Sequence, residues 1–478
     1  MPLILGTNSI KDTGYDVANS ARFDSASSDN LQRTYGTPTN AKIFGLSWWI
    51  KISKTGAQND FWGERADTSN RVITAINTDG TFQYFEKNGG STALDLKTNR
   101  LFRDVSAWYH FLILVDTTQG TASNRLKLYI NGVQETSFAT ETYPAEDYTP
   151  RLSTNTVKYF GRVGNGGSLS SNYINGYLAE AAFVDGNVTA HTDYGEFDED
   201  SGIWKPIDVS GLTFGNNGFY LDFEDSSALG DDVSGNGNDF TVNNLTAIDQ
   251  STDTCTNNFA TLNPLAQTTT KGTVSQGNLE YDRSGSSDGW VSILSTIGAS
   301  SGKYYAEVKI IDVGSPSQGC VLGFLNLDES NIQSSSSTYL GAATADAGMG
   351  WYSVGNVFRQ GGHVNIINSY TDNDIVMLAM DLDNGFCYFG KNGSWENSGD
   401  PTSGSSGTGG YATSNMTANG TYCFAVSCRE AGNVQMNFGS PSFAISSGNT
   451  DGNGYGNFEY APPSGYYALN TKNLAEYG

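Results

Sequence analysis

Two strand-turn-strand patterns constrain the fold of this chain more than any other feature. The segments "KLYINGVQ" (127–134) and "CYFGKNGSW" (387–395) each alternate aromatic and polar residues and then reach Asn-Gly. Asn-Gly between two alternating segments is the strongest short-range signal for a two-residue β-hairpin. An apolar strand precedes each pattern, at 110–116 and 374–383. We therefore expect the same antiparallel unit once in each half of the chain.

The length of 478 residues fits two domains, because single domains usually have roughly 100–200 residues. Short alternating segments recur through both halves, whereas the only short helix that we expect covers 190–197. A stretch rich in Thr, Asn and Asp separates the halves, and we place the boundary near Leu265. The sequence predicts an all-β protein: two antiparallel jelly-roll-like β-sandwiches in tandem, at 1–265 and 266–478.

The charge balance excludes one class of partner. The chain has 26 basic and 50 acidic residues, a net charge of −24, so most of its surface would repel a phosphate backbone. It also has no apolar run of 18 residues, and no basic segment precedes the four-residue apolar run at its N-terminus. We expect no nucleic-acid partner, no membrane insertion and no signal peptide.

The cysteines suggest a reducing compartment. Their number is odd and no two form a CxxC pair, so neither a zinc site nor a disulfide framework is indicated. We expect reduced and mostly buried thiols at Cys255, Cys320, Cys387, Cys423 and Cys428.

Two carboxylate pairs are candidate catalytic groups, because retaining glycosidases need two carboxyl groups roughly 5–5.5 Å apart. Asp222 and Glu224 share one strand face, which alternation turns toward solvent. Glu196 and Asp198 lie in an acidic turn without a third acid, and His110 is not in a nucleophile-elbow sequence. We therefore expect a protein that is not an enzyme.

One loop offers hard oxygen ligands that suit Ca²⁺, which makes Ca²⁺ the only candidate cofactor. The alternative is an ordinary Asx-rich turn that its own side chains cap. The candidate metal ligands in "DDVSGNGND" are Asp231, Asp232, Asn236, Asn238 and Asp239.

Aromatic residues in expected loops of the second half are candidate ligand-binding residues, because rings can stack on sugars or dock proteins. Each could instead pack in the core. Trp395 follows an Asn-Gly turn and precedes the polar run 398–415, which reads as a long surface loop. The five candidates are Trp351, Tyr352, Phe358, Tyr370 and Trp395.

The first half resembles the laminin-G-like branch of the concanavalin A-like sandwich fold. The resemblance rests on "WYHFLILVDTTQGTASNRLKLYINGVQ", "YFGRVG" and "INGYLAEAAFVDG". The residues that occupy the places typical of that branch are Trp108, His110, Tyr129, Asn131, Gly132, Gly176 and Glu180. The segment 219–242 is the counterpart of a first strand pair in many such domains, yet here it follows the domain. We expect it to return and complete the first sandwich, as in a circular permutation.

The second half is similar to a SPRY domain in "SSGKYYAEVKI", "GWYSVGNVFRQGG", "DIVMLAMDLDNGFCYFGKNGSW" and "NVQMNFGSPSFA". SPRY domains bind partners through loops at one end of the sandwich, so this resemblance implies binding by 326–341, 352–362 and 398–415.

The pairing of these two modules resembles virion proteins of marine tailed bacteriophages. The resemblance implies a non-enzymatic phage virion surface protein, of tail fibre or capsid decoration type. It would assemble in the host bacterial cytoplasm and lie on the virion exterior. The implied partners are other virion proteins and, as a further candidate, host surface polysaccharide. We expect a homo-oligomer, with a trimer favoured. The alternatives are a tail receptor-binding protein proper and a glycan-degrading enzyme on a glucanase-like sandwich.

Overall fold

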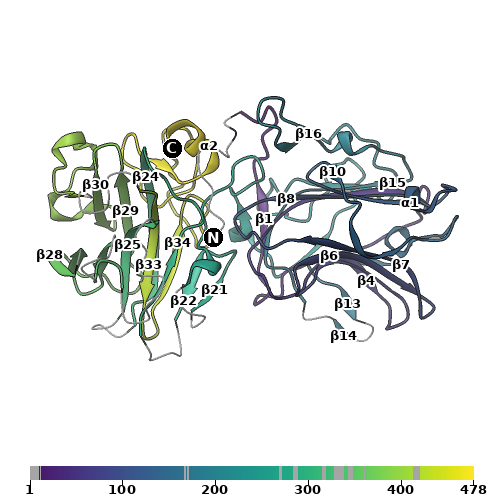
Figure 1. The fold of residues 1–478 in the computed structure, drawn as a ribbon, viewed down its shortest axis with the longest axis horizontal. Helices are drawn as coiled ribbons and strands as arrows, with labels where there is room; N and C mark the ends of the chain where they lie inside the picture. Colours follow the sequence, from purple (N-terminus) through teal and green to yellow (C-terminus); the bar gives the residue numbers. More distant parts are fainter. Residues whose placement is uncertain are drawn as a thin grey trace. The chain divides into compact units, whose positions relative to one another are not determined.

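The computed structural model forms two compact units, one of which is Thr13–Thr256 while the other contains Asn257–Gly478. Nearly all regular structure in both units is antiparallel β-sheet (Figure 1). The boundary falls between Thr256 and Asn257 and not near Leu265. The structure describes residues 10, 12–165, 168–169, 172–267, 272–283, 289–314, 319–327, 339–342, 348–359, 361–412 and 420–478.

The first unit contains two eight-stranded sheets (Figure 1). We call one the β8 sheet; its order is β10 (Val133–Gln134), β9 (Leu126–Ile130), β8 (Tyr109–Asp116), β3 (Ile43–Ile52), β15 (Gly176–Asp185), β1 (Ser20–Phe23) and β20 (Gln250–Ser251), with β18 (Phe219–Leu221) beside β15. We call the other the β5 sheet; its order is β11 (Phe138–Thr142), β7 (Ser91–Leu101), β6 (Thr81–Asn88), β5 (Arg71–Ile76), β4 (Asn59–Arg65), β12 (Val157–Phe160), β2 (Asn30–Thr34) and β19 (Thr241–Asn243). Two short hairpins, β13 (Gly164–Asn165) with β14 (Ser168–Leu169) and β16 (Gly195–Phe197) with β17 (Trp204–Pro206), and the short α1 (Ala122–Arg125) complete the unit.

Aromatic residues from both sheets form the core of the first unit. Trp48 of β3 stacks on Phe111 of β8, with ring centroids 5.4 Å apart, and Phe82 of β6 lies 4.7 Å from Phe111. A register shift in β4 turns both Phe61 and Trp62 into this core. The Thr74 hydroxyl compensates for the shift, because it accepts a hydrogen bond from the Trp62 N–H and donates one to the Trp62 carbonyl.

The segment after β15 covers the outer face of the β8 sheet. Tyr194 and Phe214 pack there against Leu112 and Val184. The helix expected at 190–197 is absent from this segment: a single 3₁₀ turn, His191–Asp193, leads directly into β16. Strand pairing explains this difference, because Glu196 lies opposite Lys205 and Phe197 lies opposite Trp204, which keeps 195–197 extended.

The segment 219–242 contributes to both sheets of the first unit. Tyr220 of β18 lies opposite Ala182 of β15, and Val242 of β19 lies opposite Leu31 of β2. Phe219, Leu221 and Phe240 are core residues.

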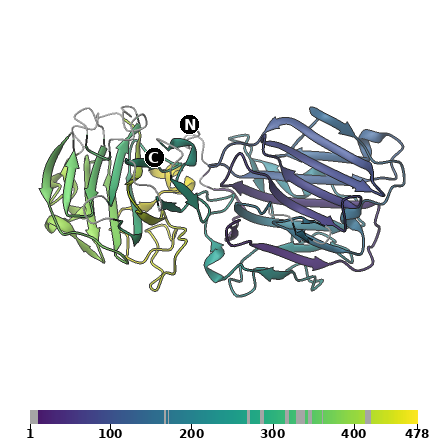
Figure 2. The same cartoon turned by 90° about the horizontal axis from the view of Figure 1, so that it is seen from below.

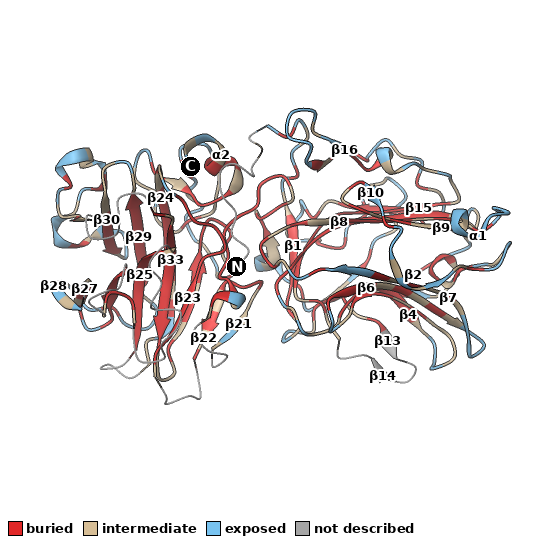
Figure 3. Cartoon of the chain, viewed as in Figure 1, coloured by how far each residue is buried: buried red, intermediate tan, exposed pale blue. Residues whose placement is uncertain are grey.

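The second unit also contains two sheets. We call the nine-stranded one the β24 sheet; its order is β21 (Thr273–Ser275), β22 (Glu280–Asp282), β34 (Asn433–Asn437), β24 (Lys303–Asp312), β29 (Ile375–Asp381), β30 (Phe386–Lys391) and β31 (Ser394–Trp395), with β32 (Tyr411–Ala412) beside β30 and β35 (Tyr467–Ala468) beside β24. The six-stranded β25 sheet has the order β23 (Val291–Leu294), β33 (Tyr422–Cys428), β25 (Cys320–Asn326), β26 (Gly348–Tyr352), β27 (Asn356–Arg359) and β28 (Gly362–Ile366). Its central strands are buried along their length, whereas the edge strand β28 is largely exposed (Figure 3).

Both predicted hairpins are confirmed. Ile130 pairs with Val133 across Asn131-Gly132, and Lys391 pairs with Ser394 across Asn392-Gly393. All four turn residues have positive φ, between 48° and 83°, as a type I′ turn requires.

The second unit ends in α2 (Thr471–Tyr477), whose first turn is capped by the Asn470 side chain. Of the helices in the described ranges, none is both long and apolar enough to cross a bilayer.

Candidate functional site

Two of the five predicted ligand-binding aromatics lie in the core of the second unit. Trp351 is fully buried and Tyr370 is 1% exposed, and their rings meet edge to face at 5.0 Å. The Tyr370 hydroxyl donates to the carbonyls of Cys320 and Trp351, and the Trp351 Nε1 donates to the Asn368 carbonyl. Neither ring has a free face for a ligand, so the expectation that these two residues bind one is wrong.

The other three aromatics are also packed. Tyr352 and Phe358 are each 8% exposed and lie in one aromatic cluster with Trp290 and Tyr339. Trp395 is half-buried and packs edge to face near Tyr305 and Tyr388, 6.4 Å from each ring. The structure therefore brings Tyr352 and Phe358 together but leaves Trp395 apart from them.

The polar run 398–415 is more ordered than expected over its described part. A 3₁₀ segment covers Pro401–Ser406 and strand β32 follows it, while residues 413–419 lie outside the described residues. The Asp400 side chain caps the 3₁₀ segment through the Thr402 N–H. Of the loop 326–341, positions 328–338 also lie outside the described residues.

The candidate Ca²⁺ loop is organised around Asp232. The Asp232 carboxylate accepts hydrogen bonds from the backbone N–H groups of Tyr220, Ser234 and Asn238. The amides of Asn236 and Asn238 both donate to the Gly218 carbonyl, and Asp239 accepts from the Asp232 N–H. Burial, and then the neighbouring Asp239, raise the pKa of Asp231. Among the described residues no group of three acidic, His or Cys side chains could hold a metal ion, and this loop is an Asx-rich turn capped by its own side chains.

A buried serine and a buried histidine lie within hydrogen-bonding distance, but the hydrogen bond runs from the histidine to the serine, opposite to the direction that catalysis requires. The His110 Nε2 is 2.8 Å from the Ser47 Oγ, and the Trp204 Nε1 donates to the His110 Nδ1. Because Nδ1 accepts, the neutral ring carries its proton on Nε2 and donates to Ser47. Burial lowers the pKa of His110 to about 3, so this histidine is a core residue that cannot take the serine proton.

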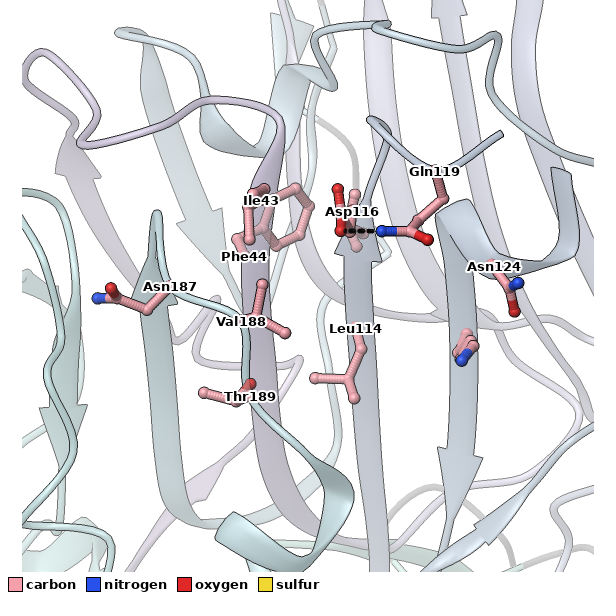
Figure 4. A pocket seen from close by; sticks show the side chains of 11 residues that line it. Ile43, Phe44, Leu114, Asp116, Gln119, Asn124, Asn187, Val188 and Thr189 are labelled. Atoms are coloured by element: carbon pink, nitrogen blue, oxygen red, sulfur yellow. Dashed lines mark hydrogen bonds between the residues drawn. The ribbon is translucent and has the colours of Figure 1, made fainter. Parts of the chain in front are cut away.

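The outer side of β3 and β8 has a small pocket of about 270 Å³ (Figure 4). Leu114 forms part of its wall, and Val188 and Thr189 lie beside it. Its acidic group is already engaged, because Asp116 accepts hydrogen bonds from the Gln119 amide and the Thr118 hydroxyl. With Phe44 only 1% exposed, the pocket has no aromatic ring face for a ligand.

A larger hollow of about 330 Å³ lies on the outer face of the β5 sheet. Figure 2 views the first unit from below and shows the strands of this sheet side by side. Side chains alternate between the two faces of each strand. Val72 of β5, Tyr84 of β6 and Leu94 of β7 point into the core, so their neighbours along each strand point outward and form this face. The hollow is lined by Gln58, Arg71, Ile73, Ala75, Asn77, Gln83 and Phe85.

Strand register brings these side chains together. Ile73 of β5 lies directly opposite Phe85 of β6, and Ala75 lies opposite Gln83. The guanidinium carbon of Arg71 is 5.3 Å from the centroid of the Phe85 ring. A half-buried ring with a cation at one end therefore forms the middle of the hollow.

Hydrogen bonds hold the amide groups of the hollow in place. The Asn77 Nδ2 donates to the Gln83 Oε1 at 3.3 Å, and the Gln83 Nε2 donates to Asp95 at 2.6 Å. The Gln58 Nε2 donates to Asp60, also at 2.6 Å. Burial raises the pKa of Asp95. The hollow thus combines one aromatic face with three oriented amides.

Sequence reasoning missed this face. The strands at 71–77 and 81–87 are visible in the sequence, but each carries bulky apolar residues on both of its faces, such as Phe82 on one face and Phe85 on the other. The sequence alone does not tell which face of the strand points into the core. The contact between a cation and an aromatic residue on neighbouring strands, as for Arg71 of β5 and Phe85 of β6, appears only once the register is known.

Comparison with known proteins gives one family match: residues 25–192 match the model of the concanavalin A-like lectin/glucanases superfamily, which spans β2 to the turn after β15. A search of curated protein sequences found no match.

Several solved structures are similar to parts of this chain. The SPRY domain of human HERC1 is 17% identical, with 37% of this chain and 96% of that chain covered and a TM-score of 0.29. A putative carbohydrate binding protein from Bacteroides ovatus is 13% identical, with coverages of 48% and 59% and a TM-score of 0.32. A SAP-like pentraxin from Limulus polyphemus is 14% identical, with coverages of 37% and 81% and a TM-score of 0.29. The match to the concanavalin A-like lectin/glucanases superfamily covers residues 25–192, which contain the whole hollow.

Proposed function

We propose that the first unit is a non-catalytic carbohydrate-binding domain whose ligand lies in the hollow on the outer β5 face. The observation that carries this proposal is the half-buried Phe85 ring, flanked by the hydrogen-bonded amides of Gln83 and Asn77. Sugars present apolar C–H faces that pack on aromatic rings and hydroxyl groups that bind amides. The family match supports the proposal, because the superfamily's description names lectins.

The positions of the carboxylates favour binding over hydrolysis. No residue that lines the hollow is Asp, Glu or His. The nearest acids on this face are Asp60 on β4 and Asp95 on β7, which are separated by two intervening strands. Three strand spacings put their backbones roughly 14 Å apart, whereas hydrolysis needs carboxyl groups about 5–9.5 Å apart. The proposal therefore includes no reaction and no cofactor.

A matched pair of variants tests the proposal. Phe85→Ala removes the ring from the hollow, and Phe197→Ala removes a ring that is 46% exposed on β16, outside the hollow. We expect Phe85→Ala to weaken binding roughly tenfold to the polysaccharides that the wild type binds, and Phe197→Ala to leave this binding unchanged. Affinity electrophoresis in gels that contain each polysaccharide measures the effect. Equal retardation of both variants and of the wild type would contradict the proposed site.

We further propose that the protein is a component of the exterior of a tailed phage particle, where the glycan would belong to the host surface. This proposal rests on the resemblance of the two-module order to phage virion proteins, and it includes homo-oligomeric assembly and contacts with other virion proteins. Mass spectrometry of purified particles and immunogold labelling test it. Absence of the protein from intact particles would refute it, and labelling confined to the tail tip would favour a receptor-binding protein proper.

A further inference from the structure

Three cations lie side by side across adjacent strands at one end of the outer β5 face. Arg65 of β4 is directly opposite Arg71 of β5, and Arg71 is directly opposite Lys87 of β6. We call these three residues the cation row. Directly opposite residues have Cβ atoms about 4.5–5.5 Å apart, a spacing at which like charges destabilise a sheet. The proximity has an electrostatic effect, because burial and then Arg71 lower the pKa of Arg65.

No acid among the described residues forms an ion pair with the cation row, and the nearby Asp60 acts on Arg65 only at a distance, raising its pKa. None of its three side chains forms an ion pair or a hydrogen bond there, and the Nε atoms of Arg65 and Arg71 are buried without a partner. The neighbouring acids are engaged elsewhere: Asp60 accepts from Gln58, and Asp67 accepts from Ser69 and Asn70. Most other cations of this unit are paired, as Lys42 is with Asp147 and Lys158 is with Glu64.

An unpaired cation row is unusual in a chain whose net charge is −24. The row also borders the hollow directly, because Arg71 both belongs to it and lines the hollow beside Phe85. A ligand on Phe85 would therefore place its substituents against two guanidinium groups, which bind carboxylate and sulfate oxygens through paired N–H donors.

We propose that the glycan bound in the hollow is an anionic polysaccharide, whose uronate carboxylate or sulfate ester binds Arg65 and Arg71 while its sugar ring packs on Phe85. This inference rests on the proposed function and adds the ligand class. Its physical basis is charge complementarity: the anion supplies the direct ion pairs that the cation row lacks, and the rest of the acidic surface opposes unspecific attachment.

Two polymer pairs with matched backbones test the ligand class: dextran sulfate against dextran, and polygalacturonate against its methyl ester. We expect the full chain to bind at least one anionic member about tenfold or more tightly than its neutral partner, with an affinity that falls as salt rises. The first pair reports recognition of sulfate and the second recognition of uronate.

Two double variants of equal charge change test the site. Arg65→Gln with Arg71→Gln removes two charges from the cation row, and Lys42→Gln with Lys127→Gln removes two charges from other positions of the same unit. We expect the first double variant to weaken binding of the anionic polymer about tenfold or more and the second to leave it unchanged. Both double variants should unfold at the same temperature as the wild type. If both double variants weaken binding equally, general electrostatics and not the cation row is responsible, and the inference is overturned.

The remaining outcomes separate this inference from the proposed function. Binding of the neutral polymers that Phe85→Ala abolishes, and that the arginine double variant leaves intact, would overturn only the anionic ligand. Absence of binding to all four polymers would overturn both. Tighter retention on duplex DNA than on any polymer, lost in the arginine double variant, would show that the row binds phosphate and not a glycan.

Discussion

At the residue scale, Glu180 of the first unit is an ionisable group under several constraints. It is 5% exposed, lies where the register of β15 shifts, and has a φ of +50°, a conformation that costs a non-glycine residue free energy. The Tyr220 hydroxyl donates to its carboxyl at 2.7 Å and the Tyr15 hydroxyl donates at 3.2 Å. Burial is the largest effect and raises the pKa of Glu180 to about 8.

The raised pKa of Glu180 predicts a loss of stability at alkaline pH. Between an unfolded-state pKa of about 4.3 and the folded pKa of about 8, the folded state holds a proton that the unfolded state has released. Stability from this group is therefore complete below about pH 4.3 and is lost as the pH rises toward about 8. We expect Glu180→Gln, which keeps an acceptor for both tyrosines, to reduce the fall of the unfolding temperature between pH 5 and pH 8.

Differential scanning fluorimetry of the wild type and Glu180→Gln at several pH values measures this effect. Asp29 and Glu86 contribute in the same direction, because burial raises the pKa of each to about 7. Only the difference between the two proteins isolates Glu180. Parallel pH profiles would mean that Glu180 titrates at the same pH in both states.

Residue types alone did not distinguish core from surface in the second unit. Both Trp351 and Trp395 were candidates in the sequence, and Trp395 was favoured because it follows an Asn-Gly turn and precedes a polar run. Their difference comes from the neighbours that the register supplies: Trp351 is packed between Tyr370 and Phe389, whereas Trp395 lies on the edge strand β31. Long-range pairing of this kind is not encoded in the local pattern.

The burial of Trp351 predicts a large effect on stability. We expect Trp351→Ala to lower the free energy of unfolding of the second unit by about 3–5 kcal/mol, through lost packing and the cavity left behind. Trp395→Ala is the control, because this half-buried residue leaves a site that solvent can fill. Urea unfolding followed by circular dichroism compares them, and equal losses would contradict the different burial of the two rings.

At the element scale, local signals predicted the hairpins and failed for the irregular segments. Asn-Gly fixes its turn because both residues must adopt positive φ, a requirement that is local. The 3₁₀ turn at His191–Asp193 is followed instead by β16, whose extended backbone is held by pairing with β17. Local signals also failed to predict the hollow, because the hollow depends on the register of β4, β5 and β6.

The two hairpins provide a matched test of turn strain against packing. Gly132 and Gly393 have φ values of +75° and +83°, so alanine should cost each roughly 1–2 kcal/mol. A Cβ atom on Gly132 would lie 2.2 Å from the Trp204 ring, whereas one on Gly393 would lie 3.0 Å from Tyr460. We expect Gly132→Ala to cost a further ~1–3 kcal/mol through overpacking. Urea unfolding of both variants measures the difference, and equal costs would show that Trp204 moves aside freely.

At the scale of the whole molecule, the net charge indicates a surface that repels anions on average, whereas the cation row is a local site that attracts them. The charge of −24 describes the average surface, and from it we expect no retention on duplex DNA at physiological salt. The row of Arg65, Arg71 and Lys87 is a local exception that composition could not reveal, because only strand pairing places these residues side by side.

The division of the chain into two units gives a second whole-molecule prediction. The Thr-, Asn- and Asp-rich composition of 243–273 suggested a linker, yet Phe259, Ala260 and Leu262 are buried in the clusters of the second unit. Backbone hydrogen bonds anchor them, from Ala260 N–H to the Leu469 carbonyl and from Leu262 N–H to the Asn278 carbonyl. These partners are distant in sequence, which is why composition misplaced the boundary.

Two fragments of the second unit test the boundary directly, one covering 257–478 and the other 266–478. The shorter fragment lacks Phe259 and Leu262, and losing these buried side chains should cost about 5 kcal/mol or more in total, enough to unfold a marginally stable domain. We expect 257–478 to unfold cooperatively in urea and 266–478 to unfold at a much lower concentration or not to fold at all. The control is the first unit: fragments 13–256 and 13–265 should have the same midpoint, because the extra residues have no place in its core. Greater stability of 13–265, together with equal midpoints for the two second-unit fragments, would return the boundary to Leu265.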